Sequence, residues 1–102
     1  MKEYDLFLPL YYNDGSAIDP TKYQQIQDRL IETFGGLTVF PQPNQGYWQM
    51  AGVTYRDEII IFRVVTANAR VAHRVFRQLK AELKEDLQQE EILIIVRDVD
   101  TL

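Results

Sequence analysis

The chain has 102 residues, of which 46% are hydrophobic and 25% are charged, as is usual for one soluble globular domain. We therefore treat residues 1–102 as a single domain. The absence of cysteine excludes disulfides, thiolate zinc sites, cysteine nucleophiles and iron–sulfur clusters held by cysteine.

A net charge of −4 argues against a nucleic-acid partner, because nucleic-acid-binding domains usually carry a basic surface. The apolar runs are shorter than the ~20 residues of a membrane helix, so no membrane partner is expected. The first residues turn acidic at once, without the long apolar segment of a secretory signal, which predicts a cytoplasmic protein.

Patterns in the first third of the chain predict a strand followed by a helix. Leucines alternate with other residues in an expected strand over 4–10, which Pro9 either ends or leaves without one hydrogen-bond donor. Asp19 is a preferred N-cap, and apolar residues then recur at three- and four-residue spacing until Gly35. We predict a helix over Pro20–Phe34.

The middle of the chain predicts two neighbouring strands. A short strand over 37–40 is interrupted by two prolines and resumes near 46–48, so it belongs at a sheet edge, where a missing N–H is tolerated. A turn at 51–52 leads to a strand over 53–65, with a bulge expected at 57–58. The second half of this strand is nearly all apolar, which predicts burial on both faces.

A second helix is expected from Thr66 or Asn68 to about Leu87, and a last strand over Ile92–Val96. This order fits an α+β fold, the ferredoxin-like split β-α-β-β-α-β sandwich, with two helices on one face of a four-stranded antiparallel sheet of order 4-1-3-2. In that sheet Ile92–Val96 is an apolar edge strand, and such an edge invites pairing. We therefore predict a homodimer that forms through the open sheet face or through the edge strand Ile92 to Val96.

Aromatic residues outside the helices gather beside loops rich in glycine and proline, where binding sites are often found. An Asn-Asp-Gly turn near the first of them could form an anion-binding nest. The alternative is that these rings close the ends of the core or fill a dimer interface. The candidate ligand-binding residues are Tyr11, Asn13, Asp14, Tyr47, Trp48 and Tyr55.

The second expected helix has bases near its start and acids near its end, which is opposite to what the helix dipole favours. Arg70 and Arg74 share one face and form a candidate anion-binding pair. The structural alternative is that Asp28 and Glu32, near the end of the first helix, approach this basic start in an antiparallel pair of helices.

The sequence shows no catalytic constellation. Ser16, the only serine, and His73, the only histidine, are expected at opposite ends of the sheet, and no acidic pair has the neighbours of a metal site. We therefore predict no catalytic residue, no metal and no cofactor, and favour a homodimeric binding or regulatory module for a small ligand or a protein partner. A small cofactor-free enzyme of the dimeric ferredoxin-like type is the alternative by fold analogy, and nucleic-acid binding through Arg70, Arg74 and Arg77 is a third.

The chain also carries five segments that look familiar together. They are Asn13-Asp14-Gly15, Phe34-Gly35-Gly36-Leu37-Thr38, Gly46-Tyr47-Trp48, Tyr55-Arg56-Asp57 and Gln89-Glu90-Glu91-Ile92-Leu93-Ile94. With them the chain resembles, over nearly its whole length, a family of small uncharacterised bacterial α/β proteins that is common in cyanobacterial genomes. The resemblance implies a dimeric ferredoxin-like domain. It implies no activity, because the segments are structural rather than catalytic, so no functional residue is carried over.

Overall fold

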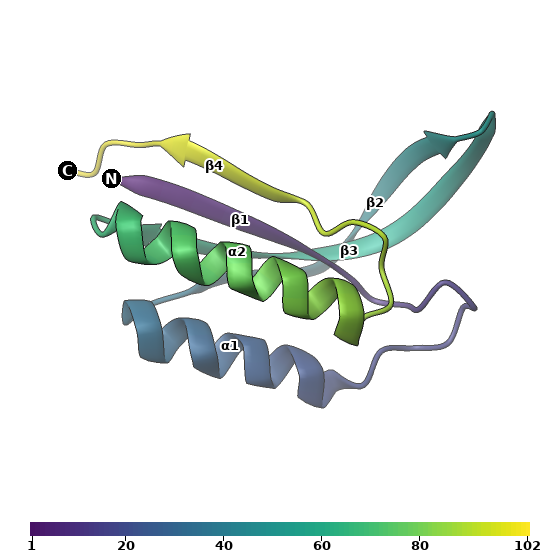
Figure 1. Cartoon of the computed structure of the whole chain (residues 1–102), viewed down its shortest axis with the longest axis horizontal. Coiled ribbons are helices and arrows are strands. Elements are labelled where there is room, and N and C mark those ends of the chain that lie inside the picture. The colour runs from purple at the N-terminus through teal and green to yellow at the C-terminus, as the bar shows by residue number, and fades with distance from the viewer.

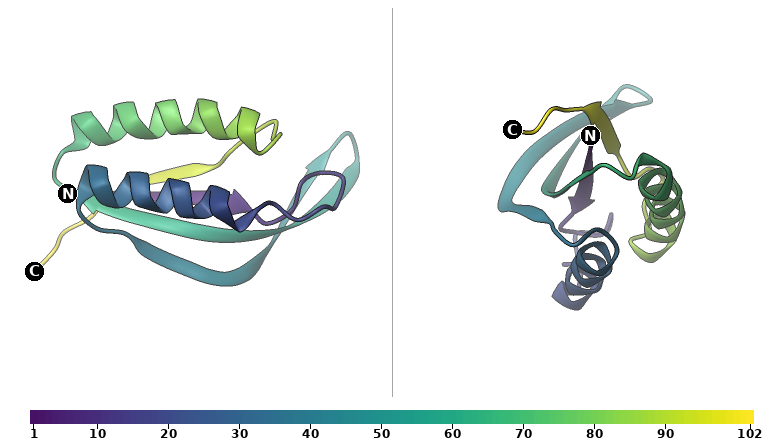
Figure 2. Two further views of the ribbon diagram at one scale, coloured as in Figure 1. Left: turned by 90° about the horizontal axis from the view of Figure 1, so that it is seen from below. Right: turned by 90° about the vertical axis from the view of Figure 1, so that its left-hand side faces the viewer.

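The computed structural model describes residues 1–102 as one sheet and two helices (Figure 1). Neighbouring strands are antiparallel, and the strands lie side by side in the order β2-β3-β1-β4. The helices cover one face of the sheet and leave the other face uncovered (Figure 2). The predicted α+β class, with a four-stranded antiparallel sheet and two helices, is confirmed. In chain order the elements are β1 (Lys2–Pro9), α1 (Pro20–Phe34), β2 (Thr38–Met50), β3 (Val53–Thr66), α2 (Ala69–Asp86) and β4 (Ile94–Asp98).

Both helices begin and end close to the predicted residues because their caps are encoded locally. The Asp19 carboxylate accepts a hydrogen bond from the backbone N–H of Thr21 at 2.9 Å, with proline at the first helical position. Gly35 ends α1 with a φ of 78°, a left-handed conformation that glycine adopts at little cost. Asn68 caps α2 in the same way as Asp19 caps α1.

β2 is longer than predicted, because it absorbs its two prolines instead of breaking at them. Phe40 pairs with Ile61 and Asn44 with Ile59, so three residues of β2 lie opposite one residue of β3. This irregularity lies in the edge strand, and the bulge predicted at 57–58 of β3 is wrong. A proline lacks the N–H of a regular ladder, so the extra residues accumulate where the prolines are.

Two further strand predictions need correction. Alternate residues of β3 from Ile60 to Val64 are buried, whereas Val65 is exposed, so the predicted burial on both faces is wrong for this chain by itself. The last strand begins at Ile94 rather than Ile92. Ile92 instead turns into the core before the strand starts, and its exposed fraction is 2%.

The core lies between the helix layer and the sheet. Phe76 of α2 stacks on Tyr4 of β1, with ring centroids 4.6 Å apart, and on Phe34 of α1, at 5.7 Å. Leu6 and Leu30 are fully buried beside them. No helix is long and apolar enough to cross a bilayer.

The outer parts of β2 and β3 run past the helices as a two-stranded ribbon, which we call the outer hairpin (residues 44–58) (Figure 1). Ala51 and Gly52 close it with φ values of 53° and 79°, the positive values that a tight hairpin turn requires. Nearly all residues from 44 to 56 are exposed. The outer hairpin therefore stands clear of the core.

Candidate functional site

The six predicted ligand-binding residues lie on two separate projections at one end of the molecule (Figure 1). The first group lies in the loop after β1. There Asn13 donates to the carbonyl of Gln88 at 3.3 Å, and Asp14 accepts hydrogen bonds from Ser16, whose hydroxyl holds the pKa of this carboxyl below its usual range. Tyr11, in the same loop, is exposed. These side chains share no hydrogen bond with the second group, which lies on the outer hairpin.

On the outer hairpin, Trp48 and Tyr55 face each other as register partners. Their rings stack with centroids 4.7 Å apart, and the indole N–H donates to Asp57 at 2.7 Å. Met50 and Val53 pair two residues further out, on the same face of the ribbon. We call Trp48, Met50, Val53 and Tyr55 the hairpin patch; each is 40–51% exposed.

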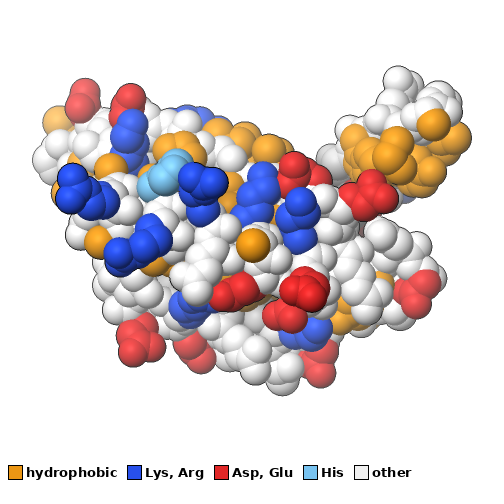
Figure 3. All heavy atoms as spheres, viewed as in Figure 1, with side chains coloured by type: hydrophobic (Ala, Val, Ile, Leu, Met, Phe, Trp, Pro, Cys, Tyr) orange, Lys and Arg blue, Asp and Glu red, His pale blue; other side chains and the backbone are white.

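The hairpin patch is one of the apolar groups visible on the surface (Figure 3). Tyr47, its neighbour in sequence, pairs with Arg56 and lies on the opposite face of the ribbon. The structure thus separates the predicted aromatic residues. The rings of Trp48 and Tyr55 are in contact, whereas Tyr47 lies on the other face of the ribbon.

A second apolar group crosses the uncovered face of the sheet. Phe7 pairs with Ile61 and Ile61 with Phe40, while the Phe7 N–H donates to the carbonyl of Leu93 at 3.1 Å. Phe7, Ile61 and Leu93 each lie between two neighbours that pack into the core, so their side chains point to the uncovered face. Phe40 follows Val39, which packs against the core, and pairs with Ile61, so it points to the same face. We call Leu93, Phe7, Ile61 and Phe40 the apolar row. It lies on the same face of the β2–β3 ladder as the hairpin patch.

Next to the apolar row lies a compact charge network. Arg63 donates two hydrogen bonds to Asp5, at 2.8 and 3.0 Å, and Arg97 donates a third at 2.9 Å. Both guanidinium groups also pair with Glu3, at 3.1 and 2.6 Å. Asp5 is only 2% exposed although no helix covers it, because the two arginines lie over it. The hydrogen bonds from Arg63, joined by that from Arg97, hold the pKa of Asp5 below its usual range.

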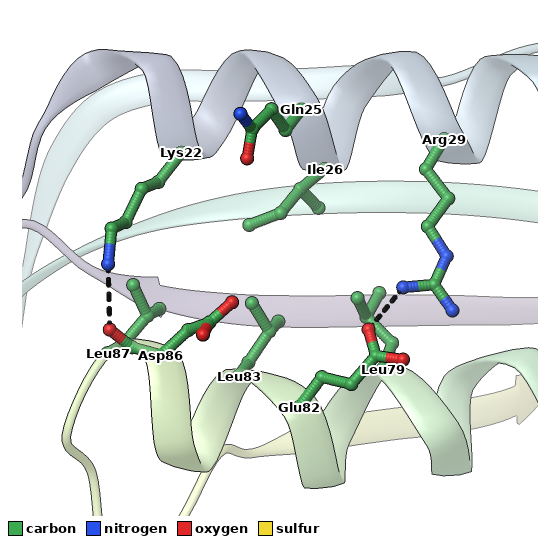
Figure 4. Close-up of a pocket in the computed structure, with 9 residues that line it drawn as sticks. All are labelled: Lys22, Gln25, Ile26, Arg29, Leu79, Glu82, Leu83, Asp86 and Leu87. Carbon is green, nitrogen blue, oxygen red and sulfur yellow. Dashed lines mark hydrogen bonds and ion pairs between the residues drawn. The ribbon is translucent and has the colours of Figure 1, made fainter.

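The helices are antiparallel, as predicted, so the last turns of α1 lie beside the basic start of α2 (Figure 1), but neither Asp28 nor Glu32 forms an ion pair. The polar contacts between the helices lie toward the other end of this antiparallel pair. Arg29 of α1 pairs with Glu82 of α2, and Lys22 donates to the carbonyl of Asp86 at 2.9 Å (Figure 4). The bases of α1 therefore meet the acidic end of α2.

The predicted anion-binding residues Arg70 and Arg74 are exposed on α2, as is Arg77, and none of the three forms an ion pair. His73 is exposed on the same helix, and Ser16 hydrogen-bonds Asp14 in the loop after β1. No group of three or more His, Asp or Glu side chains is placed to hold a metal ion.

Two surface grooves border these features, and neither is lined by a predicted site residue. One, of about 270 Å³, lies between the helices and is crossed by the Arg29–Glu82 ion pair (Figure 4). The other, of about 390 Å³, follows the irregular part of β2 from Val39 to Asn44 and borders Ile61. The second groove therefore adjoins the apolar row.

Comparison with known proteins gives a likeness of fold. No protein-family model matches the sequence, and no curated protein matches it. Among solved structures, a point variant of CutA1 from Pyrococcus horikoshii OT3 superposes with a TM-score of 0.63 at 16% identity, over 100% of this chain and 86% of the other. A phage SAM lyase in complex with S-methyl-5′-thioadenosine superposes with a TM-score of 0.62 at 13% identity, over 95% and 80%.

At these identities the likeness defines the class of fold and carries no activity to this chain. The resemblance to small bacterial proteins stays a prediction.

Proposed function

We propose that this protein is a self-associating binding module, a homodimer whose contact surface is the uncovered face of a ferredoxin-like sheet. The observation that carries the proposal is that the apolar row lies on this face and that no element of the chain covers it. The hairpin patch lies on the same side of the β2–β3 ladder and is also uncovered, although the twist of the outer hairpin makes it visible from the helix side (Figure 3). The order of elements and of strands supports the ferredoxin-like assignment.

The amount of apolar surface fits a partner of moderate size. Side chains of roughly 200 Å² each, at the exposed fractions of the hairpin patch, leave roughly 350 Å² of apolar surface bare. Phe40 and Leu93, at 38% and 53%, raise the total to about 500 Å². A typical interface takes about 800 Å² from each partner, so this area with a polar rim is sufficient.

The outer hairpin itself supports the presence of a partner. A two-stranded hairpin without a third layer is marginally stable in water. In this chain the ribbon lies beyond the helices, and the large side chains of the hairpin patch are bare. A second copy would supply the missing layer, and its own hairpin patch would be covered by the same contact, as the two-fold symmetry of most dimers requires.

The test is the mass of the full chain in solution, by light scattering, over a range of micromolar concentrations. We expect a dimer that Trp48→Ala and Leu93→Asp weaken. Trp48 exposes about 100 Å² in each subunit, or roughly 2 kcal/mol of transfer free energy, and the dimer loses this twice, which corresponds to about a thousandfold rise in Kd. Tyr47→Ala is the matched control, because this neighbouring ring lies on the other face of the ribbon. An exclusively monomeric wild type contradicts the proposal.

A further variant separates the sheet face from the sheet edge. The backbone N–H of Phe7 donates to the carbonyl of Leu93, and the N–H of Val99 donates to the carbonyl of Met1. Because hydrogen bonding alternates along an antiparallel strand, the odd-numbered residues from 93 to 99 bond to β1, and the N–H of Val96 points away from β1. Val96→Pro removes that outward donor without breaking the sheet. We expect Val96→Pro to remain dimeric. Its dissociation would assign the contact to the edge strand instead of the face.

A further inference from the structure

Three arginines on α2 differ from every other arginine of the chain. Arg70, Arg74 and Arg77 are exposed and form no ion pair. The remaining arginines all pair with carboxylates of the chain. These pairs are Arg29 with Glu82, Arg56 with Glu58, Arg63 with Glu3 and Asp5, and Arg97 with Glu3 and Asp5.

The three unpaired arginines share the outward side of α2. At 100° per residue they lie within one narrow arc, opposite the buried residues Ala72 and Phe76. Figure 3 shows Lys and Arg side chains gathered around the single histidine at this end of the helix. The acids of α2 follow only after another turn, so the first turns offer a cationic surface.

This arrangement is unfavourable within the chain. Arg70, in the first turn of α2, opposes the helix dipole, and like charges three or four residues apart on one helix face repel. Nearby carboxylates of α1 could have offset this cost, but Asp28 and Glu32 do not pair with these arginines. An anion from outside the chain would offset it.

We infer that this face of α2 binds the phosphate backbone of a nucleic acid, independently of base sequence. Guanidinium groups pair with phosphate through two parallel hydrogen bonds. From Arg70 to Arg77 the helix rises about 10 Å, which suits an extended anion with regular charges. The two grooves described above are lined by other residues, so this convex ridge fits a strand or a duplex groove better than a small molecule.

The overall charge of −4 argued against such a partner. Because the rest of the surface is therefore acidic on balance and repels phosphate, we expect the contact to be confined to this face of α2. With three phosphate contacts, the logarithm of the binding constant falls with the logarithm of the salt concentration at a slope of about −2 to −3. Binding is therefore strongest at low salt and weakens steadily as the salt concentration rises.

The experiment is fluorescence anisotropy of a labelled duplex and of its single strand, titrated with the full chain at several salt concentrations. We expect binding with the slope given above, and each of Arg70→Gln, Arg74→Gln and Arg77→Gln should reduce the slope by about 0.7–0.9. The triple variant should lose binding. Arg56→Gln is the matched control, because it removes the same charge from the outer hairpin. Thermal melting checks that every variant folds.

Three results overturn the inference. The first is no change in anisotropy at the lowest salt with either form of nucleic acid. The second is a triple variant that binds as the wild type does. The third is competition by polyglutamate at the same charge concentration as effectively as by unlabelled nucleic acid, which would assign the face to an acidic protein. Self-association does not enter these outcomes, because the arginines lie on the helix side of the molecule.

Discussion

Replacing Asp5 tests how much the charge network on the uncovered face of the sheet contributes to stability. Asp5→Asn preserves the size of the side chain but places an amide against the guanidinium groups of Arg63 and Arg97, which then retain only Glu3 as a carboxylate partner. Breaking a buried ion pair costs about 3–5 kcal/mol. The side chains of Arg63 and Arg97 are 34% and 46% exposed, so water replaces part of the lost interaction. We expect a loss of about 2 kcal/mol at pH 7 after this screening.

Urea denaturation followed by circular dichroism measures this loss, and the melting temperature should fall by about 10 °C. Asp98→Asn is the matched control on the same sheet. Its carboxylate pairs with Lys2, but its side chain is 83% exposed, so little change is expected.

The pH dependence gives an independent check. Because the folded pKa of Asp5 is lowered, its charge stabilises the fold above the unfolded pKa of about 3.9 and ceases to do so as pH falls through the folded value. The difference in unfolding free energy between wild type and Asp5→Asn should be constant near neutral pH and shrink below about pH 4. Equal stabilities at pH 7, or a difference that persists unchanged into strong acid, would refute this account of the network.

Three further substitutions test the fold by the same denaturation assay. Gly35→Ala should cost about 1 kcal/mol. Nothing lies within 4 Å of the added carbon, so a larger loss would mean that the positive φ is not the only constraint. Asn68→Ala removes the cap of α2 and should also cost about 1 kcal/mol, whereas Asn68→Asp should retain most of the stability. Leu30→Ala opens a cavity at a fully buried site and should cost about 3 kcal/mol; a loss below about 1 kcal/mol would contradict its place in the core.

The helices could be predicted from the sequence because the residues that start and end them lie next to them in the chain. The interval predicted for the first helix, Pro20–Phe34, is the interval of α1. Asp19 and Gly35 act through their own backbone neighbours, and no distant contact is needed to read their effect.

The strands were harder to predict because register and burial depend on residues far away in sequence. The prolines of β2 read as an interruption, whereas the paired strand β3 keeps β2 continuous across an irregularity. The sequence of Ile59–Val65 predicts burial on both faces because nearly all of its residues are apolar. The sequence does not distinguish apolar residues in the core from apolar residues on the uncovered face. The sequence shows that Ile61 is apolar, but it does not show that Ile61 lies beside Phe7 and Phe40 in the sheet.

The candidate sites also divide into features that the sequence indicates and features that depend on residues distant in the chain. The sequence singled out Trp48 and Tyr55, and hairpin pairing brings them into contact. It could not indicate that Asp14 is engaged by Ser16, nor that Asp5 lies under two arginines that are distant in the chain. The sequence showed the unusual charge order of α2 and predicted the antiparallel helix pair, but only the structure shows that Arg29 and Lys22 make the polar contacts between the helices.

The two proposed surfaces have a geometric consequence when they are combined. If two copies meet through their uncovered faces, their helix layers lie on opposite outer sides of the dimer, and the two arginine faces point away from each other. One short duplex could then touch only one arginine face, so the salt slope should stay near that of three phosphate contacts. The dimer would bridge two duplexes and bind one per chain. A slope near twice this value, with one duplex per dimer, would mean that the arginine faces lie side by side, and the uncovered sheet face could not then be the dimer contact.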